Sequence, residues 1–410
     1  MAKTILMLGA FDTKDEEYAF LREQILAQGH NVLAMNTGVL GSTDRFPVQI
    51  TAEEVAAAGG GDLAALRQKK DRGEAMKVMS GGAAALVAAR YASDPFDGII
   101  GMGGTGGSSV VTAAMRALPI GVPKVCVSTA ASGDTSAYVG SKDITMIPSI
   151  VDVAGLNRIS RIIFTQAAGA ISGMVSAVAS AATAAQPEDK PIITASMFGN
   201  TTDAVNAARA ALTEKGYEVF VFHATGTGGK TMEALVREGL VDAVLDITTT
   251  EWADTICGGV FDAGPERLSA AGEVGIPHLI VPGCVDMANF GGMGTVPQKY
   301  KDAGRLFYEW NPSVTLMRTN VDENRQMGEI FAQKANAAKG PVAFLIPLRG
   351  VSILDGDGEL FEDRAADAAM FDAIKANLRS DIPVVEMDVN INDPSFAAKA
   401  VEMMLGLMKD

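Results

Sequence analysis

The chain has 410 residues, 48% of them hydrophobic and 20% charged. This length exceeds what one core commonly supports, so two domains are expected, and the composition does not indicate disorder. The net charge of -15 argues against a protein that binds nucleic acid or acidic membranes non-specifically, because such proteins need surplus Lys and Arg. The three cysteines form no CxxC pair, so the sequence predicts neither a disulfide framework nor a structural zinc site and fits a reducing cytoplasm.

The first half of the chain alternates short apolar runs with segments of helical spacing. The start, MAKTILMLGAFDTKDE, has no cleavage-site pattern and is interpreted as a first strand that leads into a helix begun by Asp12 and Thr13. The segment 37–73 contains glycines, a proline and short helical pieces, and is interpreted as a lid or an insertion. Strands are expected at residues 3–8, 31–36, 96–100, 123–128 and 144–147.

The stretch GMGGTGGSS, residues 101–109, follows an apolar run and opens a segment with helical spacing. Glycines at such a junction let the backbone approach a ligand closely, and the helix start presents N–H groups to an anion. The sequence therefore predicts a phosphate cradle. Its expected members are Gly103, Gly104, Thr105, Gly106, Gly107 and Ser108.

The same loop also satisfies the dinucleotide fingerprint GxGxxG. That fingerprint belongs to the first βαβ unit of a domain, whereas two strands are expected before this loop. The next acidic residue that could bind a ribose is Asp134, which lies farther along the chain than the usual separation of about 20 residues. A dinucleotide site and a purely structural glycine turn remain as alternatives to the phosphate cradle.

The segment 156–185 predicts a long helix made largely of small residues. Its stretch 162–185 carries no charge and contains Gly169 and Gly173 at GxxxG spacing, so a membrane span is an alternative to a tightly packed helix of a soluble protein. Two prolines and three charges follow in QPEDKP, residues 186–191. We place the domain boundary there, which gives domains of residues 1–186 and 187–410.

A second series of strands and helices follows this boundary, which predicts an α/β fold of two Rossmann-like subdomains with mostly parallel sheets. The loops GAFDTKDE and FGNTTDAV follow the first strand of each half, and GGTGGSS resembles TGTGGKT, so the halves are expected to share an architecture. Loops that leave strands are rich in Gly, Ser, Thr and Asp, which favours a binding cleft between the subdomains. Strands of the second half are expected at residues 191–196, 217–222, 243–247, 278–281, 314–317, 342–346 and 384–388.

A second glycine loop, ATGTGGKT at residues 224–231, differs from the P-loop pattern GxxxxGK[ST] only in its first residue. The next strand ends near Asp246, as a Walker B strand would. The loop follows the second strand of its half, whereas a P-loop follows the first. An anion-binding helix start with Lys230 nearby is therefore the preferred interpretation over a true P-loop.

Three further residues of the second half are candidates for catalysis. Of the three histidines, His223 alone lies on the glycine-rich side, where it is suited to acid or base work, although a structural histidine is an equal alternative. Glu251 belongs to a strand-exit loop and is a candidate acid or base, with helix capping as the alternative. Arg349 is expected to anchor an anionic substrate, because a guanidinium binds a carboxylate through two bonds; a surface ion pair is the alternative.

The motifs GAFDTKDE, PSIVDVAGLN, VFHATGTGGKTME, LDITTTEWAD and LMRTNVDEN, together with the long segment around GMGGTGGSS, resemble the Tm-type ATP-binding domain family. That family is typified by the amino-terminal domain of the tomato mosaic virus resistance protein, and the similarity covers nearly all of the chain. The resemblance implies two Rossmann-like subdomains, a homodimer, and ATP with Mg²⁺ as ligand. The plant protein continues into a barrel domain, so a separate barrel protein is a possible partner.

Carried over residue by residue, the resemblance implies nucleotide contacts in three loops. These are Asp12, Thr13 and Lys14, the glycine loop from Gly103 to Ser108, and Ser132, Gly133 and Asp134. Asp12 or Asp134 is expected to hold the Mg²⁺.

The sequence thus predicts a cytoplasmic ATP-binding protein without nucleic-acid or membrane partners, acting on a small anionic metabolite as a transferase, ligase or hydrolase. Two alternatives remain. One is a dimeric regulatory module that ATP stabilises without turnover. The other is an NAD-dependent oxidoreductase.

Overall fold

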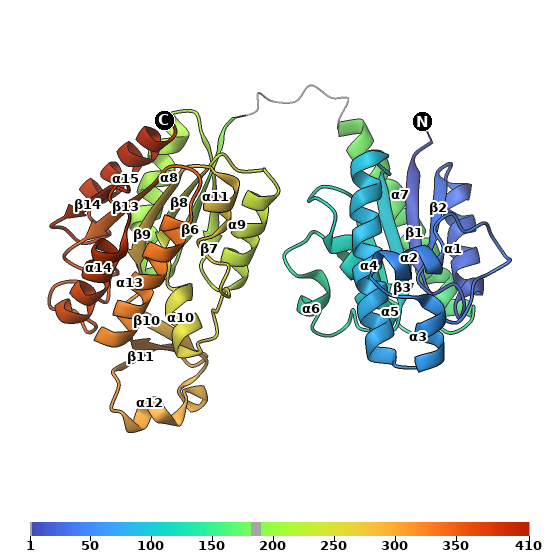
Figure 1. Ribbon diagram of the computed structural model, residues 1–410, viewed down its shortest axis with the longest axis horizontal. Helices are drawn as coiled ribbons and strands as arrows, with labels where there is room; N and C mark the ends of the chain where they lie inside the picture. Colours follow the sequence, from blue (N-terminus) through green and yellow to red (C-terminus); the bar gives the residue numbers. More distant parts are fainter. Residues whose placement is uncertain (1, 182–189, 410) are drawn as a thin grey trace. The chain divides into compact units, whose positions relative to one another are not determined.

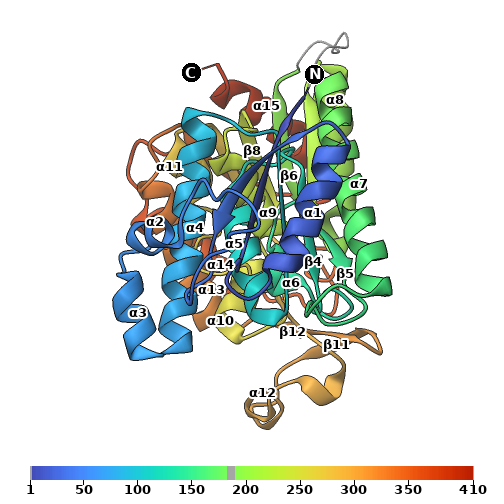
Figure 2. The ribbon, with the colours of Figure 1, turned by 90° about the vertical axis from the view of Figure 1, so that its right-hand side faces the viewer.

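The computed structural model describes residues 2–181 and 190–409, and the chain divides into two compact units, Met1–Pro187 and Glu188–Asp410. The ribbon is shown in two views (Figures 1 and 2). The predicted domain boundary at residue 186 lies outside the described residues. The predicted cleft between the units stays a prediction.

Unit 1, the first of these, is built on a five-stranded sheet in which every pair of neighbours is parallel, in the order β2-β1-β3-β4-β5. β1 and β3 are buried on both faces, which explains their nearly continuous apolar sequences. The strands are β1 (Thr4–Gly9), β2 (Asn31–Asn36), β3 (Gly98–Gly103), β4 (Lys124–Ser128) and β5 (Thr145–Pro148).

Helices cover both faces of this sheet. Side chains that alternate along β1 point to opposite faces, so Ile5 packs with α1 and α7, and Leu6 packs with α2 to α5. The predicted lid or insertion at 37–73 contains two short helices, α2 and α3, whose side chains pack in the same core as Leu6. The helices are α1 (Asp15–Ala27), α2 (Ala52–Ala58), α3 (Leu63–Lys69), α4 (Arg72–Ser93), α5 (Thr105–Arg116), α6 (Ser136–Val139) and α7 (Arg158–Ala181).

Helix α7 is long and apolar enough to cross a membrane by length and composition, and it is the one such helix among the described residues. It lies against α1 (Figure 2) and contributes seven buried residues to unit 1, among them Phe164 and Ile171. Small side chains at Ala167 and Ala168 let it approach the sheet closely. A core helix of a globular protein shows these features, and one such helix is weak evidence for a membrane span.

The second unit, unit 2, contains a six-stranded parallel sheet in the order β7-β6-β8-β9-β13-β14. α8 and α15 pack on one face, and α9, α11, α13 and α14 belong to the cores of the other. The strands are β6 (Ile192–Met197), β7 (Glu218–His223), β8 (Ala243–Thr248), β9 (His278–Gly283), β13 (Val342–Pro347) and β14 (Val384–Met387). The helices are α8 (Thr202–Glu214), α9 (Thr227–Arg237), α10 (Glu251–Cys257), α11 (Ala270–Val274), α12 (Gln298–Asp302), α13 (Val321–Asn336), α14 (Arg364–Asn377) and α15 (Pro394–Leu407), with 3-10 turns η1 (Gly199–Thr201) and η2 (Met293–Thr295).

Unit 2 also has a three-stranded antiparallel sheet, which the sequence did not predict. It consists of β10 (Met287–Phe290), β11 (Phe307–Asn311) and β12 (Val314–Arg318), in the order β10-β12-β11. The strand expected at 314–317 as part of the parallel series is β12 of this sheet, so that placement was wrong. Only two residues separate β11 from β12, so these strands form a hairpin. The strands of a hairpin are antiparallel.

Both parallel sheets begin with the same arrangement, in which the second strand flanks the first on one side and the third flanks it on the other. This confirms an α/β fold with two Rossmann-like, doubly wound sheets of the 2-1-3-4-5 order. The loops after β1 and β6 are therefore equivalent, as their sequences suggested. The two glycine loops are not equivalent, because one follows the third strand, β3, and the other follows the second, β7.

Candidate functional site

The switch point of unit 1 lies between β1 and β3, because the chain leaves these neighbouring strands in opposite directions. Their pairing ends at Leu8 and Gly101. Beyond it, the hydroxyl of Tyr18 from α1 accepts the N–H of Met102 at 2.8 Å, and its single hydrogen can be donated either to the Leu8 carbonyl at 2.8 Å or to the Met102 carbonyl at 2.7 Å. Tyr18 thus takes the place of the next backbone hydrogen bond between β1 and β3 and holds the ends of these strands apart. Ligands bind in such a crevice in doubly wound sheets.

Two glycines are required for this opening. A Cβ on Gly9 would lie 1.9 Å from the Tyr18 hydroxyl oxygen, and one on Gly103 would lie 2.8 Å from the Cα of Gly107. Sequence reasoning missed Tyr18. The available signal was its place in the apolar stripe Tyr18, Leu21 and Ile25 of α1, where a polar tip on a buried position needs a partner.

The glycine loop begins α5, a helix of 12 residues whose N-cap, Gly104, has no side chain to satisfy the helix start. The N–H groups of Thr105, Gly106 and Gly107 have no hydrogen-bond partner within residues 2–181 and 190–409. The Ser108 hydroxyl is buried and donates inward, to the Ser128 oxygen at 2.6 Å or to the Gly103 carbonyl. The groups of this loop that are left to bind an anion are therefore backbone N–H groups rather than the Ser108 side chain.

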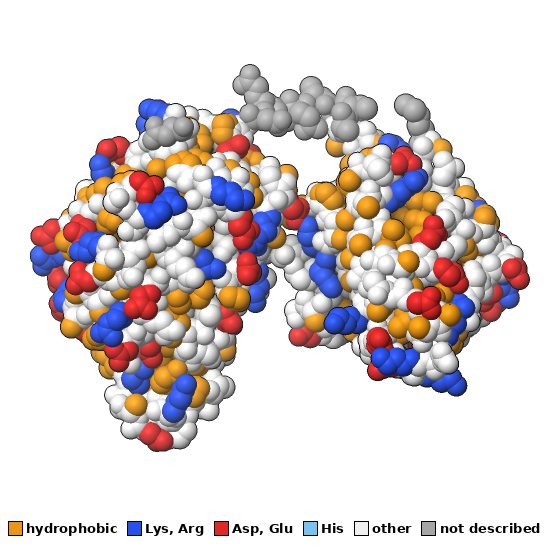
Figure 3. All heavy atoms as spheres, viewed as in Figure 1, with side chains coloured by type: hydrophobic (Ala, Val, Ile, Leu, Met, Phe, Trp, Pro, Cys, Tyr) orange, Lys and Arg blue, Asp and Glu red, His pale blue; other side chains and the backbone are white. Residues whose placement is uncertain are grey.

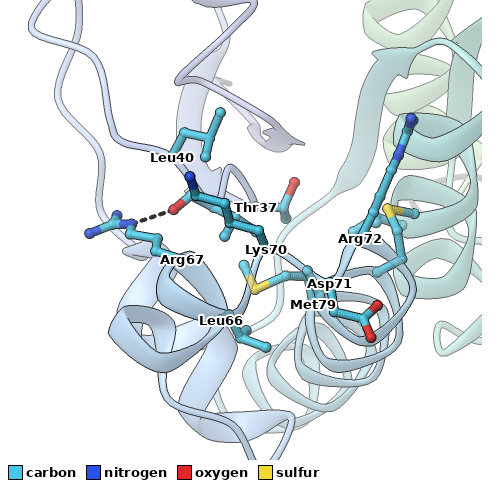
Figure 4. A pocket seen from close by; sticks show the side chains of 12 residues that line it. Thr37, Leu40, Leu66, Arg67, Lys70, Asp71, Arg72 and Met79 are labelled. Carbon is cyan, nitrogen blue, oxygen red and sulfur yellow. Dashed lines mark hydrogen bonds between the residues drawn. The ribbon is translucent and has the colours of Figure 1, made fainter.

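A cavity of about 360 Å³ lies beside this helix start, within the range of about 300–1,000 Å³ typical of ligand pockets. Its walls come from the loop after β2, the α3–α4 turn and α5, so the segment interpreted as a lid or insertion supplies most of it (Figure 4). Apolar side chains of Val39, Leu66, Met76, Met79 and Val110 line its interior, which suits a flat uncharged group.

Three basic side chains, Arg67, Lys70 and Arg72, surround the cavity, with Arg67 and Arg72 on opposite sides in Figure 4. Arg67 donates to the Val39 carbonyl. Lys70 and Arg72 have no hydrogen bond or ion pair from their side chains in the described chain. A Cβ on Gly106 would lie 3.4 Å from Nη2 of Arg72, so this guanidinium is adjacent to the glycine loop. The arrangement joins an apolar pocket to a cationic, N–H-rich rim.

The loop after β1 contains the other predicted nucleotide residues. Asp12 accepts the N–H of Leu40 at 2.7 Å through Oδ2, while its Oδ1 is buried and has no partner in the described chain. Thr13 is exposed, and Lys14 donates to the carbonyl of Val153 in the loop after β5. Asp12 therefore links the β1 loop to the loop that lines the cavity, and one of its buried oxygens has no hydrogen-bond partner in the described chain.

The third predicted loop lies apart from this cavity. Ser132, Gly133 and Asp134 are exposed, and Asp134 accepts the N–H of Ser136 at 2.9 Å, which lowers the pKa of this carboxyl. A separate cavity of about 390 Å³ is lined by Ser132 and by Ile150, a β-branched residue that is 70% exposed with a φ of 64°. Asp12 and the glycine loop thus adjoin the first cavity through Leu40 and Arg72 without lining it, and neither Ser132 nor Asp134 lines it. No group of three His, Cys, Asp or Glu able to hold a metal is found among the described residues.

The second glycine loop, in unit 2, is filled by a side chain of the protein itself. Glu251 Oε1 accepts the N–H groups of Gly226 and Gly229 at 2.8 and 3.0 Å, at the start of α9. A Cβ on Gly229 would lie 2.3 Å from Glu251 Oε2, so the glycine is needed for this carboxylate. The carboxylate occupies the position where a P-loop would bind phosphate, and Glu251 is fully buried.

Glu251 belongs to a buried network around Arg267, which is 1% exposed. Arg267 donates to Glu251 at 2.6 Å, to Asp246 at 2.9 Å and to Glu233 at 3.3 Å. His278 lies 2.9 Å from Asp246 through Nε2. Burial alone would raise the pKa of Asp246, but the charge and hydrogen bonds of Arg267 lower it below its ordinary value. Asp246 and Glu251 are thus engaged in a structural network.

The remaining predicted catalytic residues lie apart. Lys230 is exposed on α9, and His223 is exposed at the end of β7, where it lines another cavity. Arg349 donates to Asp357 at 2.7 Å and lies 3.8 Å from Asp388. Further carboxylates line the hollow beside Arg349, so an anionic substrate would meet acids there. Acidic and basic side chains are interspersed over the face shown in Figure 3.

Two family models match the chain. Residues 3–180 match the amino-terminal domain and residues 190–408 the carboxy-terminal domain of the uncharacterised protein family UPF0261. A UPF0261 protein of Clostridium tetani is 46% identical over 413 residues, covering 100% of both chains. In Solanum lycopersicum, the ToMV susceptible protein tm-1 is 35% identical over 98% of this chain and 55% of its own length. The ToMV resistance protein Tm-1 of the same plant is 39% identical over 82% of this chain and 44% of its own length. This chain spans about half the length of those plant relatives, and it belongs to the UPF0261 family.

Proposed function

We propose that unit 1 binds ATP, with its phosphates at the start of α5. The observation that carries this proposal is the adjacency of three features: an apolar cavity, the N–H groups of Thr105 to Gly107, and the guanidinium of Arg72, the latter two without partners in the part of the chain that the structure describes. A helix start attracts an anion through its N–H groups and its dipole. ATP is the nucleotide that the resemblance to the Tm-type family implies.

In this proposal the cavity of about 360 Å³ takes the adenine and ribose. Met76, Met79 and Val110 supply apolar contact, and methionine adapts well to a flat ring. Arg72 lies between the cavity and Gly106, so it is placed to pair with phosphate oxygens. Lys70 adds a second positive charge at the rim.

Mg²⁺ would reach the site with the nucleotide. Mg²⁺ commonly binds through one or two carboxylates together with phosphates and waters, so a dedicated cluster of acids is not needed. Asp12 fits this role better than Asp134, because its Oδ1 has no partner among the described residues and its loop adjoins the cavity. Asp134 lies in the exposed loop after β4.

Titration calorimetry of ATP with and without Mg²⁺ tests the proposal on the wild type and on Gly106→Val. The added side chain would point toward Arg72 and Met76 and obstruct the phosphate position, so we expect binding to weaken at least about tenfold, or about 1.4 kcal/mol. Gly81→Val is the matched control, because Gly81 is also helical and a Cβ there meets nothing within 4 Å. No ATP binding to the wild type, or equal binding to all three proteins, would refute the proposal.

We further propose that the bound ATP is used in an enzymatic reaction on a small metabolite. A regulatory module stabilised by ATP is the alternative, and ATP turnover in the presence of candidate metabolites distinguishes the two. An NAD-dependent oxidoreductase is less favoured, because the glycine loop follows the third strand of its sheet whereas a dinucleotide fingerprint follows the first. Tight binding of NAD in place of ATP would reverse this preference.

A further inference from the structure

Unit 2 contains a cavity of about 190 Å³ that the nucleotide proposal does not use. It lies at the carboxyl ends of β6 and β7 and is covered by the β11–β12 hairpin. Phe198, Phe261 and Trp310 form its aromatic walls, and Asn200, His223 and Thr225 are among its polar residues. This edge of a parallel sheet is where ligands bind in doubly wound folds.

The aromatic side chains lie on more than one side of the cavity. Phe198 meets His223 with a centroid separation of 5.4 Å and Phe261 with one of 6.0 Å, both edge to face. The indole of Trp310 approaches the opposite loop so closely that a Cβ on Gly199 would lie 3.9 Å from Cζ2. Trp310 is nevertheless 51% exposed, so it closes the cavity from the solvent side. Aromatic rings in this arrangement favour a planar ligand.

One buried polar atom of this region lacks a partner. Asn200 is 2% exposed, and its Oδ1 has no hydrogen bond in the described chain. Its Nδ2 donates only to the sulfur of Met287, at 3.5 Å. An unsatisfied buried acceptor destabilises the fold, so native proteins commonly retain one where a ligand or water supplies the donor. A ligand at the floor of the cavity with an O–H or N–H group would satisfy Asn200.

His223 supplies a second polar group. Its ring is exposed at the end of β7 and makes no hydrogen bond within the described residues, although it contacts the edge of Phe198. An imidazole with both nitrogens available can donate to or accept from a ligand substituent. Asn200 and His223 are therefore two polar groups without hydrogen-bond partners for Oδ1 and the imidazole in the described chain, in a cavity whose other walls are largely aromatic and aliphatic, which is the composition of small-molecule sites.

We propose that this cavity binds a small aromatic or heteroaromatic compound that carries a hydrogen-bond donor. The ring lies between Trp310 and the Phe198–Phe261 pair, and the donor reaches Asn200. The volume is below the roughly 300–1,000 Å³ of pockets that hold drug-sized ligands, which limits the compound to about one ring with short substituents. This site is independent of the nucleotide site proposed for unit 1.

Phenol and its methyl ether, anisole, are suitable probes, because they share the ring and only phenol has a donor. Binding to the full chain is measured by ligand-observed NMR and by quenching of Trp310 fluorescence; Trp252, the other tryptophan, is buried. We expect phenol to bind about fivefold more tightly than anisole, the effect of one neutral hydrogen bond. Asn200→Leu is expected to abolish this preference, and Trp310→Ala to weaken both probes.

Tyr308→Ala is the matched control, because Tyr308 lies on the same strand beside Trp310 but does not line the cavity. It should leave both affinities unchanged. The proposal is overturned if neither probe binds the wild type, if the preference for phenol survives in Asn200→Leu, or if Tyr308→Ala weakens binding as much as Trp310→Ala does. If Asn200→Leu fails to fold, the affinities of phenol and anisole for the wild type, Trp310→Ala and Tyr308→Ala still test the proposal.

Discussion

The hydroxyl of Tyr18 accepts the backbone N–H of Met102 at 2.8 Å, and this single side chain joins α1 to the end of β3. Without it, the N–H of Met102 would be buried and unpaired, because the pairing of β3 with β1 stops one residue earlier. The same hydroxyl lies within hydrogen-bonding distance of the carbonyls of Leu8 and Met102, at the ends of both strands, and donates to one of them. Tyr18 therefore couples the stability of unit 1 to the shape of the proposed nucleotide site.

Tyr18→Phe is expected to destabilise the protein by about 1–3 kcal/mol, the cost of a buried donor left without a partner. ATP affinity should fall as well, because the crevice between β1 and β3 would close or become disordered. Denaturant unfolding and calorimetry measure the two effects. Tyr91→Phe serves as the control, since Tyr91 packs against Phe96 and no hydrogen bond of its hydroxyl is found in the described chain.

Arg72→Gln is expected to weaken ATP binding by a factor of about 10 to 100, because a charge-assisted hydrogen bond contributes about 1.5–3 kcal/mol. Stability should change by less than about 0.5 kcal/mol, as for most exposed residues. The matched control is Arg90→Gln, at the other end of α4, where the arginine pairs with Asp94. Equal losses of affinity in both variants would indicate a general charge effect rather than contact with phosphate.

Glu251→Ala is expected to destabilise unit 2 by about 3–5 kcal/mol, because it leaves Arg267 with one carboxylate fewer inside the core. The same change exposes the N–H groups of Gly226 and Gly229 as an anion site. Added phosphate or sulfate should therefore raise the melting temperature of the variant much more than that of the wild type. Glu266→Ala, which removes an exposed carboxylate near Arg237, should show neither effect. A variant indifferent to phosphate would contradict the interpretation of this loop.

The stability of unit 2 should fall as the pH rises toward about 8 because of Asp254. Burial raises the pKa of this carboxyl from its ordinary value of 3.8 to about 8. Since the folded state holds the proton more tightly than the unfolded state, the stabilisation is fully present below about pH 4 and is lost as the pH rises through 8. Asn289 Oδ1 has no partner in the described chain. After rotation of the Asn289 amide, this oxygen can accept a hydrogen bond from the protonated Asp254 carboxyl.

Asp254→Asn mimics the protonated carboxyl and should flatten this decline. Unfolding measured in denaturant from pH 5 to 9 tests the prediction. Asp242→Asn is a control, because Asp242 is exposed and accepts only the Ile192 N–H. A wild-type slope that persists in Asp254→Asn would assign the pH dependence to other buried acids, of which Asp355 also has a pKa raised to about 8 by burial.

The sequence predicted the parallel strands and the glycine loop well, because buried strands are continuous apolar runs and Gly103 marks an obligatory close approach. It predicted poorly what depends on contacts distant in sequence. Glu251 lies 22 residues from Gly229, so nothing local shows that its carboxylate fills the second glycine loop. β10 and β11 were also missed, since strand β11 is mostly exposed and lacks the apolar run of a core strand.

The carboxylate of Glu251 occupies the anion position at the start of α9, so we expect the two units to respond differently to added anionic ligands. Unit 2 carries its own anion at the start of α9, whereas the N–H groups at the start of α5 in unit 1 have no partner in the described chain and are where we propose that a nucleotide binds. Resistance to proteolysis should reflect this difference. Cleavage within unit 1 is expected to slow as nucleotide concentration rises, and cleavage within unit 2 is expected to remain constant, so one polypeptide would report the nucleotide level through only half of its length.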